Sequence, residues 1–342
     1  MPTVQGLAAD GVEVTRSDEL VVVSFRSMAS PVTLTVVDPG PDAELHLTRA
    51  VEAVRDVERT CSRFDATSAL SRANAAPEQW HQVPATLAAA VSEAYRAHRE
   101  TDGLFDPRIL DVLLGWGYDR TLPFVDGAVT RDPAALPAVT PAATVRRPAP
   151  WHPEIVESDG EWWIRLGDQP IDLGGIGKGL AVRWAADELA DAGAGYAVDA
   201  GGDEALAGVG PDGPRWRVGV EDPSDHAELV LVLDVTDTGC ATSSIRRRRW
   251  TSGGAHVHHL VDPRTRRPGG AGLAAVTVLA PDAAWSEVWS KTLFLAGASE
   301  IRSVAEDLGL TAAWVHEDGT VGTTTRMDPL VIWTARELEA HR

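Results

Sequence analysis

The stretch IDLGGIGKGL, residues 171–180, combines a carboxylate, a glycine-rich turn and a lysine within a short span. An apolar lead-in and a following helical pattern predict a strand-to-helix corner with little side-chain bulk. Such a corner presents free backbone N–H groups and the positive end of a helix dipole, which together favour phosphate. A tight connection between a strand and a helix is the alternative interpretation.

Two familiar phosphate-binding loops are excluded at this corner. A P-loop has Ser or Thr directly after Gly-Lys, but Gly179 follows Lys178 here. A dinucleotide fingerprint has a third glycine three positions after the second, and that position after Gly177 is Leu180. The corner therefore indicates an anion or nucleotide site whose type stays open.

A second stretch with potential chemistry is HVHHLVDPRTRRP, residues 256–268, which has three histidines on a short predicted strand. Strand alternation puts His256 and His258 on one face and His259 on the other. An active-site role for one histidine is therefore a more economical interpretation than a site in which all three bind a metal.

Further polar and aromatic residues lie in predicted turns. Asp199 and Asp203 flank a glycine turn, where paired acids serve a metal or a ribose but more often cap the turn. Phe105 and Asp106 lie in DGLFDP, a turn that suits either a flat heterocycle or the protein surface. Met28, in the turn SMAS, is either core filler or the floor of a pocket for a flat ligand.

Two clusters of charged side chains have ordinary structural interpretations. Residues 246–249 are four consecutive arginines, a run typical of a solvated edge strand, and at most two of them can face one ligand. Glu287 and Lys291 stand four apart on one face of a predicted helix. Such a pair on a surface stabilises a helix by about 0.2–0.5 kcal/mol.

The chain has 342 residues, enough for one large domain or two intimate ones. Its 50 acidic and 31 basic residues give a formal charge of −19, which argues against nucleic acid or an anionic membrane as a partner. An anionic ligand must therefore be held by a local cluster of positive charge. Cys61 and Cys240 are the only cysteines, so we expect no disulfide framework and no thiolate metal cluster.

The N-terminal sequence has no basic start and no apolar run. We therefore expect no signal peptide, no membrane anchor and a cytoplasmic location. We expect residues 1–18 to form a loose arm and residues 19–342 a single domain. Residues 121–150, rich in Pro, Ala and Thr, are expected to form a long surface excursion of that domain.

Hydrophobic periodicity predicts the elements that must position the candidate residues. Predicted helices cover residues 43–61, 87–101, 282–297 and 301–308. A β-hairpin is predicted at residues 20–25 and 32–37, and further strands at 162–166, 171–173, 196–208, 216–220, 229–235, 274–280, 312–315 and 331–334. We expect strands 162–166 and 171–173 to pair directly before the glycine corner.

Taken in order, these motifs resemble the ApbE family, the FAD:protein FMN transferases. The resemblance covers the chain from about residue 24 to residue 297. It rests on SMAS, SRFDATSALSRAN, DGLFDP with GWGY, IDLGGIGKG, DAGGDEALAG, ATSSIRRR, HHLVDPRT and VTVLAPDAAWSEVWSKTLFLAG. Each motif is weak alone, but their shared order makes the resemblance specific.

The resemblance implies a single α/β (α+β) domain of the T-fold-like kind, with antiparallel sheets and helices packed on them. It implies FAD in a cleft, with Mg²⁺ at the pyrophosphate, and a flavin-acceptor protein as the second substrate. The implied reaction moves FMN from FAD to a Ser or Thr hydroxyl of that protein and releases AMP. Such a site must stabilise charge on the phosphate oxygens and accept a proton from the hydroxyl.

The resemblance also assigns individual residues through the matching motifs. The implied FAD contacts are Met28, Phe64, Leu104, Phe105, Asp106, Asp172, Lys178 and Leu260. The backbone carbonyl of Gly175 is an implied metal ligand. Lys178 is expected to reach a phosphate. His259 and Asp262 are expected beside the pyrophosphate, with His259 as the candidate base.

The predicted helix 282–297 departs from the family pattern. The family usually has an Asp and, four residues later, a Thr, both on Mg²⁺, whereas this chain has Glu287 and Lys291. Glutamate can bind Mg²⁺ after a small shift, but an ammonium group offers only donors. We therefore expect Lys291, held by Glu287, to weaken or replace Mg²⁺. Ser244 and Arg266 replace loop glycines near the acceptor side, so acceptor docking is expected to differ.

Three functions stay open from the sequence. The first is FMN transfer to a cytoplasmic flavoprotein. The second is FAD pyrophosphatase activity, in which water takes the place of the acceptor hydroxyl. The third is a non-catalytic FAD-binding protein that has lost its metal site.

Overall fold

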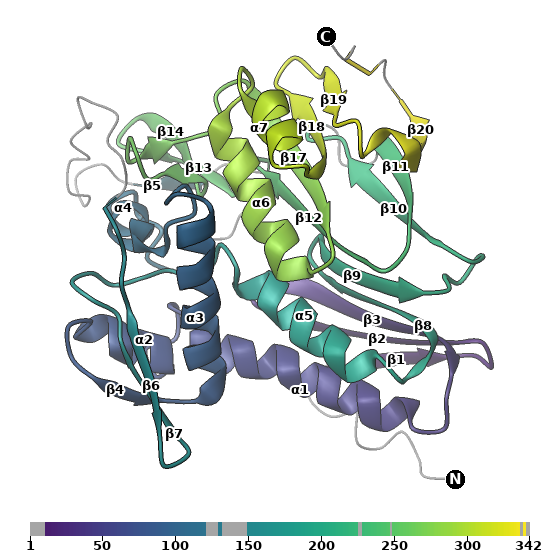
Figure 1. The fold of residues 1–342 in the computed structure, drawn as a ribbon, viewed down its shortest axis with the longest axis horizontal. Helices are drawn as coiled ribbons and strands as arrows, with labels where there is room; N and C mark the ends of the chain where they lie inside the picture. Colours follow the sequence, from purple (N-terminus) through teal and green to yellow (C-terminus); the bar gives the residue numbers. More distant parts are fainter. Residues whose placement is uncertain are drawn as a thin grey trace.

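A large antiparallel sheet runs through the molecule (Figure 1). The computed structural model describes residues 11–120, 129–131, 149–224, 228–246, 248–335 and 338–339. The sheet has nine strands in the order β1-β2-β3-β8-β9-β12-β17-β18-β19. Their bounds are β1 Glu13–Arg16, β2 Leu20–Ser27, β3 Ser30–Pro39, β8 Gly193–Ala200, β9 Asp203–Gly208, β12 Thr238–Ser244, β17 Leu273–Ala280, β18 Thr311–His316 and β19 Val321–Thr323. The predicted α/β class with antiparallel sheets and packed helices is confirmed.

Three helices, α1 Ala43–Cys61, α5 Gly177–Leu189 and α6 Ala283–Ala296, lie along one face of this sheet (Figure 1). The side of α1 that is buried carries apolar side chains at helical spacing: Leu47, Ala50, Val51, Val54 and Val57. Burial of each large member contributes roughly 1.5–3 kcal/mol. Helix α5 packs against both α1 and α6, so the glycine corner that precedes it is held between two other helices.

The remaining helices are shorter or lie beside this layer. They are α2 Ala69–Ala75, α3 Ala85–Glu100, α4 Leu110–Gly115 and α7 Ile301–Asp307, with the 3₁₀ turns η2 Pro107–Ile109 and η5 Asp328–Leu330. The predicted helices at 43–61, 87–101, 282–297 and 301–308 are confirmed to within two residues at each end. Among the described residues, no helix is both long and apolar enough to cross a membrane.

Smaller sheets flank the large one. They contain β4 His81–Val83, β6 Glu154–Ser158 and β7 Glu161–Arg165; β10 Trp216–Glu221, β11 Leu229–Val235 and β20 Val331–Thr334; β5 Val129–Arg131, β13 Arg249–Ser252 and β14 Ala255–His258; and the pair β15 Val261–Asp262 and β16 Arg267–Pro268. The predicted strand at 331–334 therefore exists but belongs to the sheet with β10 and β11 rather than to the large sheet.

Strands β10 and β11 help to bury the face of the large sheet that lies away from the helices. Trp216 and Leu231 join Cys240 and Leu279 in one apolar cluster there. Adjacent residues of one strand point to opposite faces. For this reason Asp203 contacts Lys178 on the helix side of the sheet. The next residue, Glu204, points to the other face and pairs in register with Cys240.

The expected pairing of strands 162–166 and 171–173 is wrong. Strand β7 pairs with β4 and β6, and residues 171–173 form no strand. The backbone of Ile171 is instead bonded by one side chain, because its N–H donates to Asn74 Oδ1 and its carbonyl accepts from Asn74 Nδ2, both over 2.8 Å. The N–H of Asp172 donates to the Pro107 carbonyl over 2.7 Å. Polar groups from distant parts of the chain thus form the backbone hydrogen bonds of the segment before the corner.

The expected loose arm is wrong for residues 13–16, which form β1 and pair with β2. Residues 1–10 lie outside the described part of the chain, as does most of the predicted excursion at 121–150. Within that excursion, residues 129–131 form β5, which pairs with β13 in parallel. The boundary at residue 19 and the single domain after it stay predictions.

Gly179 lies where the backbones of α5 and α6 approach each other closely. A Cβ placed on it would lie 2.6 Å from Ala284 Cα and 2.8 Å from the Ala283 carbonyl oxygen. We expect Gly179→Ala to lower the free energy of unfolding by about 1–3 kcal/mol, because the two backbones must separate. Denaturant unfolding measures this change.

Gly177→Ala is the matched control, since a Cβ on Gly177 meets nothing within 4 Å. It should leave stability unchanged or raise it by up to about 1 kcal/mol through helix propensity. Equal stability of the two variants would contradict the close packing described here.

Candidate functional site

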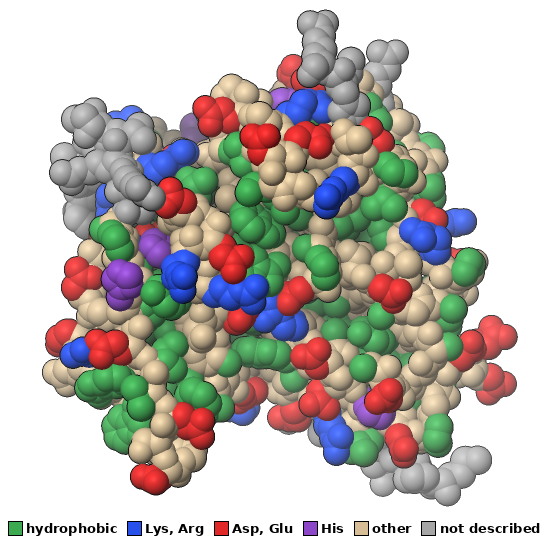
Figure 2. All heavy atoms as spheres, in the orientation of Figure 1, with side chains coloured by type: hydrophobic (Ala, Val, Ile, Leu, Met, Phe, Trp, Pro, Cys, Tyr) green, Lys and Arg blue, Asp and Glu red, His purple; other side chains and the backbone are tan. Residues whose placement is uncertain are grey.

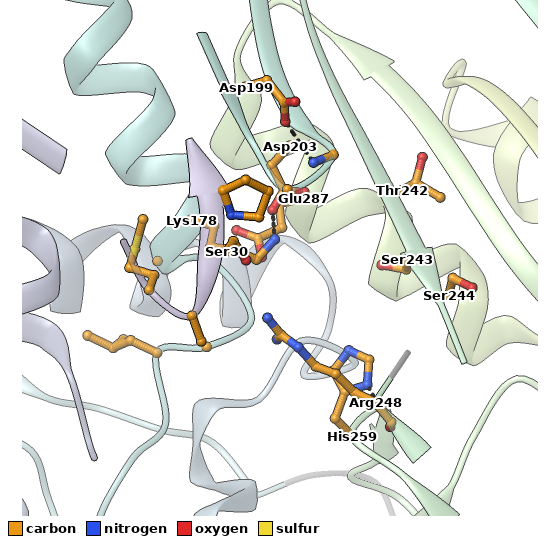
Figure 3. Close-up of a pocket in the computed structure, with 18 of the residues that line it drawn as sticks. Ser30, Lys178, Asp199, Asp203, Thr242, Ser243, Ser244, Arg248, His259 and Glu287 are labelled. Atoms are coloured by element: carbon orange, nitrogen blue, oxygen red, sulfur yellow. Dashed lines mark hydrogen bonds and ion pairs between the residues drawn. The ribbon is translucent and has the colours of Figure 1, made fainter. Parts of the chain in front are cut away.

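A cavity of about 1220 Å³ opens where the glycine corner meets the ends of β8, β9 and β12 (Figure 3). Its lining includes Asp172 and Lys178 from the corner, Asp199 from β8, and Thr242 from β12. The volume exceeds the roughly 300–1,000 Å³ of pockets for drug-sized ligands, so the cavity has room for a dinucleotide.

Acidic and basic side chains are interspersed over the face of the molecule drawn in Figure 2. The formal charge of the whole chain is −19. Any attraction for an anion must come from the charges inside the cavity.

Four charged side chains from three elements meet in the cavity, and Figure 3 labels three of them, Lys178, Asp203 and Glu287. Lys178 Nζ contacts Asp203 and lies 3.9 Å from Glu287 Oε1. Lys291 Nζ donates to the same Glu287 oxygen over 3.0 Å. The backbone N–H of Gly179 donates to Glu287 Oε2 over 2.8 Å. We call these four side chains the ion network.

The ion network corrects two expectations. Glu287 is 0% exposed, so the pair of Glu287 and Lys291 is buried rather than on the surface. The N-terminus of α5 is also not fully free for a phosphate, because its Gly179 N–H already binds the Glu287 carboxylate. The helix dipole at this end therefore stabilises the protein's own anion, which in turn holds two ammonium groups.

Burial governs the ionisation of this network. Burial lowers the pKa of Lys178 to about 7, with Glu287 opposing the change and Arg248 and Lys291 adding to it. Burial also lowers the pKa of Lys291. For Glu287, burial raises the pKa, but Lys291 and Lys178 outweigh it and leave the pKa below its usual value. Arg248 lowers the pKa of both lysines and Lys291 lowers that of Lys178, so a bound anion between these cations would relieve the repulsion.

Arg248 and His259 lie opposite the ion network (Figure 3). The N–H of His259 donates to the Arg248 carbonyl over 3.2 Å. Burial lowers the pKa of His259 well below its usual value, and Arg248 adds to this effect. The imidazole is therefore neutral at pH 7 and able to accept a proton. His259 lines the cavity, whereas His256 and His258, which strand alternation put on the other face, do not.

The expectation of a solvated edge strand for the arginine run is wrong. Strand β12 ends at Ser244, before the run, and lies between β9 and β17 in the sheet. Arg246 is only 9% exposed and donates to Glu221 over 2.7 Å. Both Arg246 and Arg248 line the cavity, because the chain turns at this point instead of continuing in the sheet.

The rings of Phe64 and Tyr118, which we call the aromatic shelf, form a third side of the cavity. The guanidinium of Arg63 lies 4.0 Å from the ring centre of Phe64 and 4.7 Å from that of Tyr118. Arg63 Nε donates to Asp172 Oδ2 over 3.0 Å, and the N–H of Gly174 donates to Asp172 Oδ1 over 2.7 Å. Phe64 is 42% exposed and Tyr118 only 8%, so Phe64 is the ring of this pair that a ligand can reach.

Met28 lies at the cavity in the turn between β2 and β3. Its N–H donates to Glu58 Oε1, and Ser27 Oγ donates to Glu58 Oε2, both over 2.7 Å. Helix α1 thereby fixes a turn in which Met28 has a positive φ of 50°. The hydrogen bonds to Glu58 offset the backbone strain of that conformation.

Six predicted site residues do not line this cavity: Leu104, Phe105, Asp106, Gly175, Leu260 and Asp262. Phe105 is buried behind the corner, since its Cε2 lies 2.9 Å from the place of a Cβ on Gly175. Asp106 accepts hydrogen bonds from Arg108. The structure therefore places this turn as a support of the corner.

The two predicted residues after His259 have structural partners. Leu260 is buried in an apolar cluster with Phe294. The carboxylate of Asp262 accepts from the Arg264 N–H over 2.8 Å and from its guanidinium. Asp262 therefore stabilises its own turn. It does not line the cavity, contrary to the prediction that it lies beside the pyrophosphate.

Some cavity residues had no clear signal in the sequence. Glu58 and Arg63 lie at and just after the end of α1, Tyr118 lies far from them in the chain, and each is an ordinary polar or aromatic residue of a helix end or loop. Asp199 and Asp203 had a weak signal as paired acids at a glycine turn. Arg248 belongs to the run of four arginines. Strand alternation allowed two of them to face one ligand but did not identify which two.

Comparisons with known proteins agree with this arrangement. A sequence model described as the ApbE family matches residues 28–314. The FAD:protein FMN transferase of Salmonella typhimurium is 29% identical over 254 residues, which cover 72% of this chain and 69% of the relative. The FAD:protein FMN transferase of Escherichia coli K12 is 26% identical and covers 89% and 86%.

Solved structures share the fold. The ApbE protein of Thermotoga maritima superposes with a TM-score of 0.75 at 21% identity and covers 93% of this chain and 99% of its own. The flavin transferase ApbE of Vibrio cholerae gives a TM-score of 0.71 at 22% identity and covers 91% and 99%. At these identities the likeness establishes the fold alone.

We expect acid to destabilise the protein through its buried histidines. Burial lowers the pKa of His258 to about 4. Between pH 6.5 and 4 the unfolded chain binds a proton on this side chain and the folded chain does not, so stability falls as the pH decreases. His258→Gln should remove about 2–3 kcal/mol of that loss, as measured by denaturant unfolding at pH 7 and pH 4.5.

The matched control is His256→Gln, because His256 is exposed on the same strand. It should leave the pH dependence of stability unchanged. An identical acid dependence in the wild-type protein and His258→Gln would show that burial does not hold His258 neutral.

Proposed function

The chain belongs to the ApbE family, and from this we propose that it is an FAD:protein FMN transferase. In this proposal it moves FMN from FAD to a Ser or Thr hydroxyl of an acceptor protein and releases AMP. The observation that carries the proposal is the convergence of Lys178, Lys291 and Arg248 on one cavity beside the neutral imidazole of His259. The activity named for the curated relatives agrees with it.

The cavity suits FAD as a substrate in charge and in shape. The pyrophosphate lies against Lys178, Lys291 and Arg248, which supply positive charge inside a protein of negative net charge. A flat ring system of FAD packs on the aromatic shelf of Phe64 and Tyr118. Asp172, fixed by Arg63, is the hydrogen-bond acceptor next to that shelf.

The chemistry is an in-line displacement at the FMN phosphorus. The acceptor oxygen forms a bond to phosphorus, the bridging P–O bond of the pyrophosphate breaks, and AMP leaves. His259 accepts the proton of the attacking hydroxyl, for which its neutral state is required. The cations stabilise the charge that develops on the phosphate oxygens and on the leaving AMP.

The side chains at the family's metal position do not fit Mg²⁺ in this chain. Mg²⁺ needs about six oxygen ligands in a near-octahedral arrangement. Here Glu287 binds Lys291 and the Gly179 N–H, and Lys291 carries no lone pair. Within the described ranges, no three His, Cys, Asp or Glu side chains are grouped as a metal site. The displacement above is therefore derived from protein groups alone.

One incubation with FAD separates the three candidate functions. Transfer gives AMP and covalent flavin fluorescence on an acceptor protein in a denaturing gel. Hydrolysis gives AMP and free FMN, because water has taken the place of the hydroxyl. FAD that binds but stays unchanged would overturn the proposal in favour of a binding protein. The acceptor and its expected cytoplasmic location stay predictions.

We expect His259→Gln to lower the rate of AMP formation by about 10²-fold or more, because the proton acceptor is lost. The Kd for FAD should change little, since glutamine keeps a polar side chain of similar reach. AMP release is followed by chromatography under single-turnover conditions. A loss of FAD binding with an unchanged bound-state rate would instead assign His259 a binding role.

We expect Arg248→Met to raise the Kd for FAD about 10-fold or more, because a guanidinium near the phosphate is lost. Flavin fluorescence titration measures the Kd. Arg249→Met is the matched control, since Arg249 is exposed on β13 and does not line the cavity. Equal effects of the two substitutions would contradict the placement of the pyrophosphate.

A further inference from the structure

A lysine fills the position that the family assigns to part of a metal site. Lys291 Nζ donates to Glu287 Oε1 over 3.0 Å, one helical turn away on α6. The aliphatic part of Lys291 lies against the glycine corner, with its Cδ 3.6 Å from the place of a Cβ on Gly175. Lys291 therefore bonds to Glu287 and lies beside Gly175, the two other residues that the family resemblance names as metal ligands.

The Glu287 carboxylate has both oxygens engaged. Oε2 accepts from the Gly179 N–H over 2.8 Å, and Oε1 accepts from Lys291 and lies 3.9 Å from Lys178 Nζ. The residue is 0% exposed. A divalent cation at Glu287 would have to displace an ammonium group from a buried carboxylate, and the displaced charge would then lack its partner.

We propose that the ammonium of Lys291 takes the place of the divalent cation, so that this chain holds its anionic ligand without a metal ion at Glu287. The identity of that ligand, the pyrophosphate of FAD, rests on the proposed function. An ammonium has three N–H donors, and among the described residues Lys291 has one hydrogen-bond acceptor, Glu287. Two donors are then available for phosphate oxygens.

The neighbouring cations make up for the smaller charge of an ammonium. Mg²⁺ carries two charges and Lys291 one, but Lys178 and Arg248 line the same cavity. Arg248 lowers the pKa of both lysines, which shows that its charge acts at the same place as theirs. A fixed ammonium supplies electrostatic stabilisation without coordination, so a chelator should leave FAD binding unchanged.

The deciding experiment uses Mn²⁺ as the probe, followed by electron paramagnetic resonance with and without FAD. We expect the wild-type protein to bind no stoichiometric Mn²⁺. One Mn²⁺ per chain with a Kd on the order of 100 µM or tighter, displaced by Mg²⁺, would overturn the proposal. This measurement needs no substitution and no turnover.

A double variant, Glu287→Asp with Lys291→Thr, supplies the pair that the family usually carries. We expect it to bind one Mn²⁺ at least about 10-fold more tightly than the wild-type protein, because a hydroxyl and a free carboxylate replace the ammonium pair. A folded double variant that binds no Mn²⁺ would also overturn the proposal, since Lys291 would not be what excludes the metal. Circular dichroism establishes that the variant is folded.

FAD titrations with EDTA or Mg²⁺ separate this proposal from the proposed function. The wild-type Kd should agree within about two-fold between the two buffers, and Lys291→Met should raise it about 10-fold or more in both. A wild-type Kd that rises about 10-fold in EDTA would overturn metal-independent binding. If FAD binds in neither buffer, the proposed function fails, and the Mn²⁺ measurement without FAD still decides whether Lys291 excludes the metal.

Discussion

The site depends on the hydrogen bonds that the buried Glu287 carboxylate of α6 accepts at the N-terminus of α5. Glu287 is fully buried, and an isolated charge there would be strongly unfavourable. Its stability comes from the Gly179 N–H at the helix N-terminus and from the Lys291 ammonium, with Lys178 nearby. These partners are satisfied only when α5 and α6 lie almost in backbone contact, which Gly179 permits. The same constraint that packs two helices therefore places two ammonium groups at one cavity.

The glycine corner is held in place by groups that do not themselves face the cavity. Asn74 bonds both backbone groups of Ile171, and Phe105 lies behind Gly175. Asp172 is turned toward Arg63 and the aromatic shelf. A rigid corner of this kind costs little reorganisation when a ligand binds, because its hydrogen bonds exist before the ligand arrives.

The local charges explain how a protein of formal charge −19 can hold a dinucleotide. The cations converge from α5, α6 and the turn after β12, and they are shielded from bulk water by burial. Inside a cavity each charge acts over a short distance at low dielectric, whereas the acidic surface is screened by salt. The depressed pKa of His259 follows from the same burial and cationic neighbours, so the anion site and the neutral base have one physical origin.

The local pattern of the chain was enough to predict the β2–β3 hairpin, four helices and the helix after the glycine corner, although the strand predicted before that corner does not form. It was also enough for the family resemblance, because ordered motifs carry that information. It could not predict that the Asn74 side chain bonds the Ile171 backbone where a strand partner was expected. It also could not predict that Phe105 supports the corner, or that Arg246 and Arg248 line the cavity. Periodicity shows which side of an element is apolar, but a polar group's partner is chosen by contacts between distant segments. The spacing of Glu287 and Lys291 is the same on a surface and in a core, and only the packing of α5 against α6 decided that the pair is buried and faces a ligand.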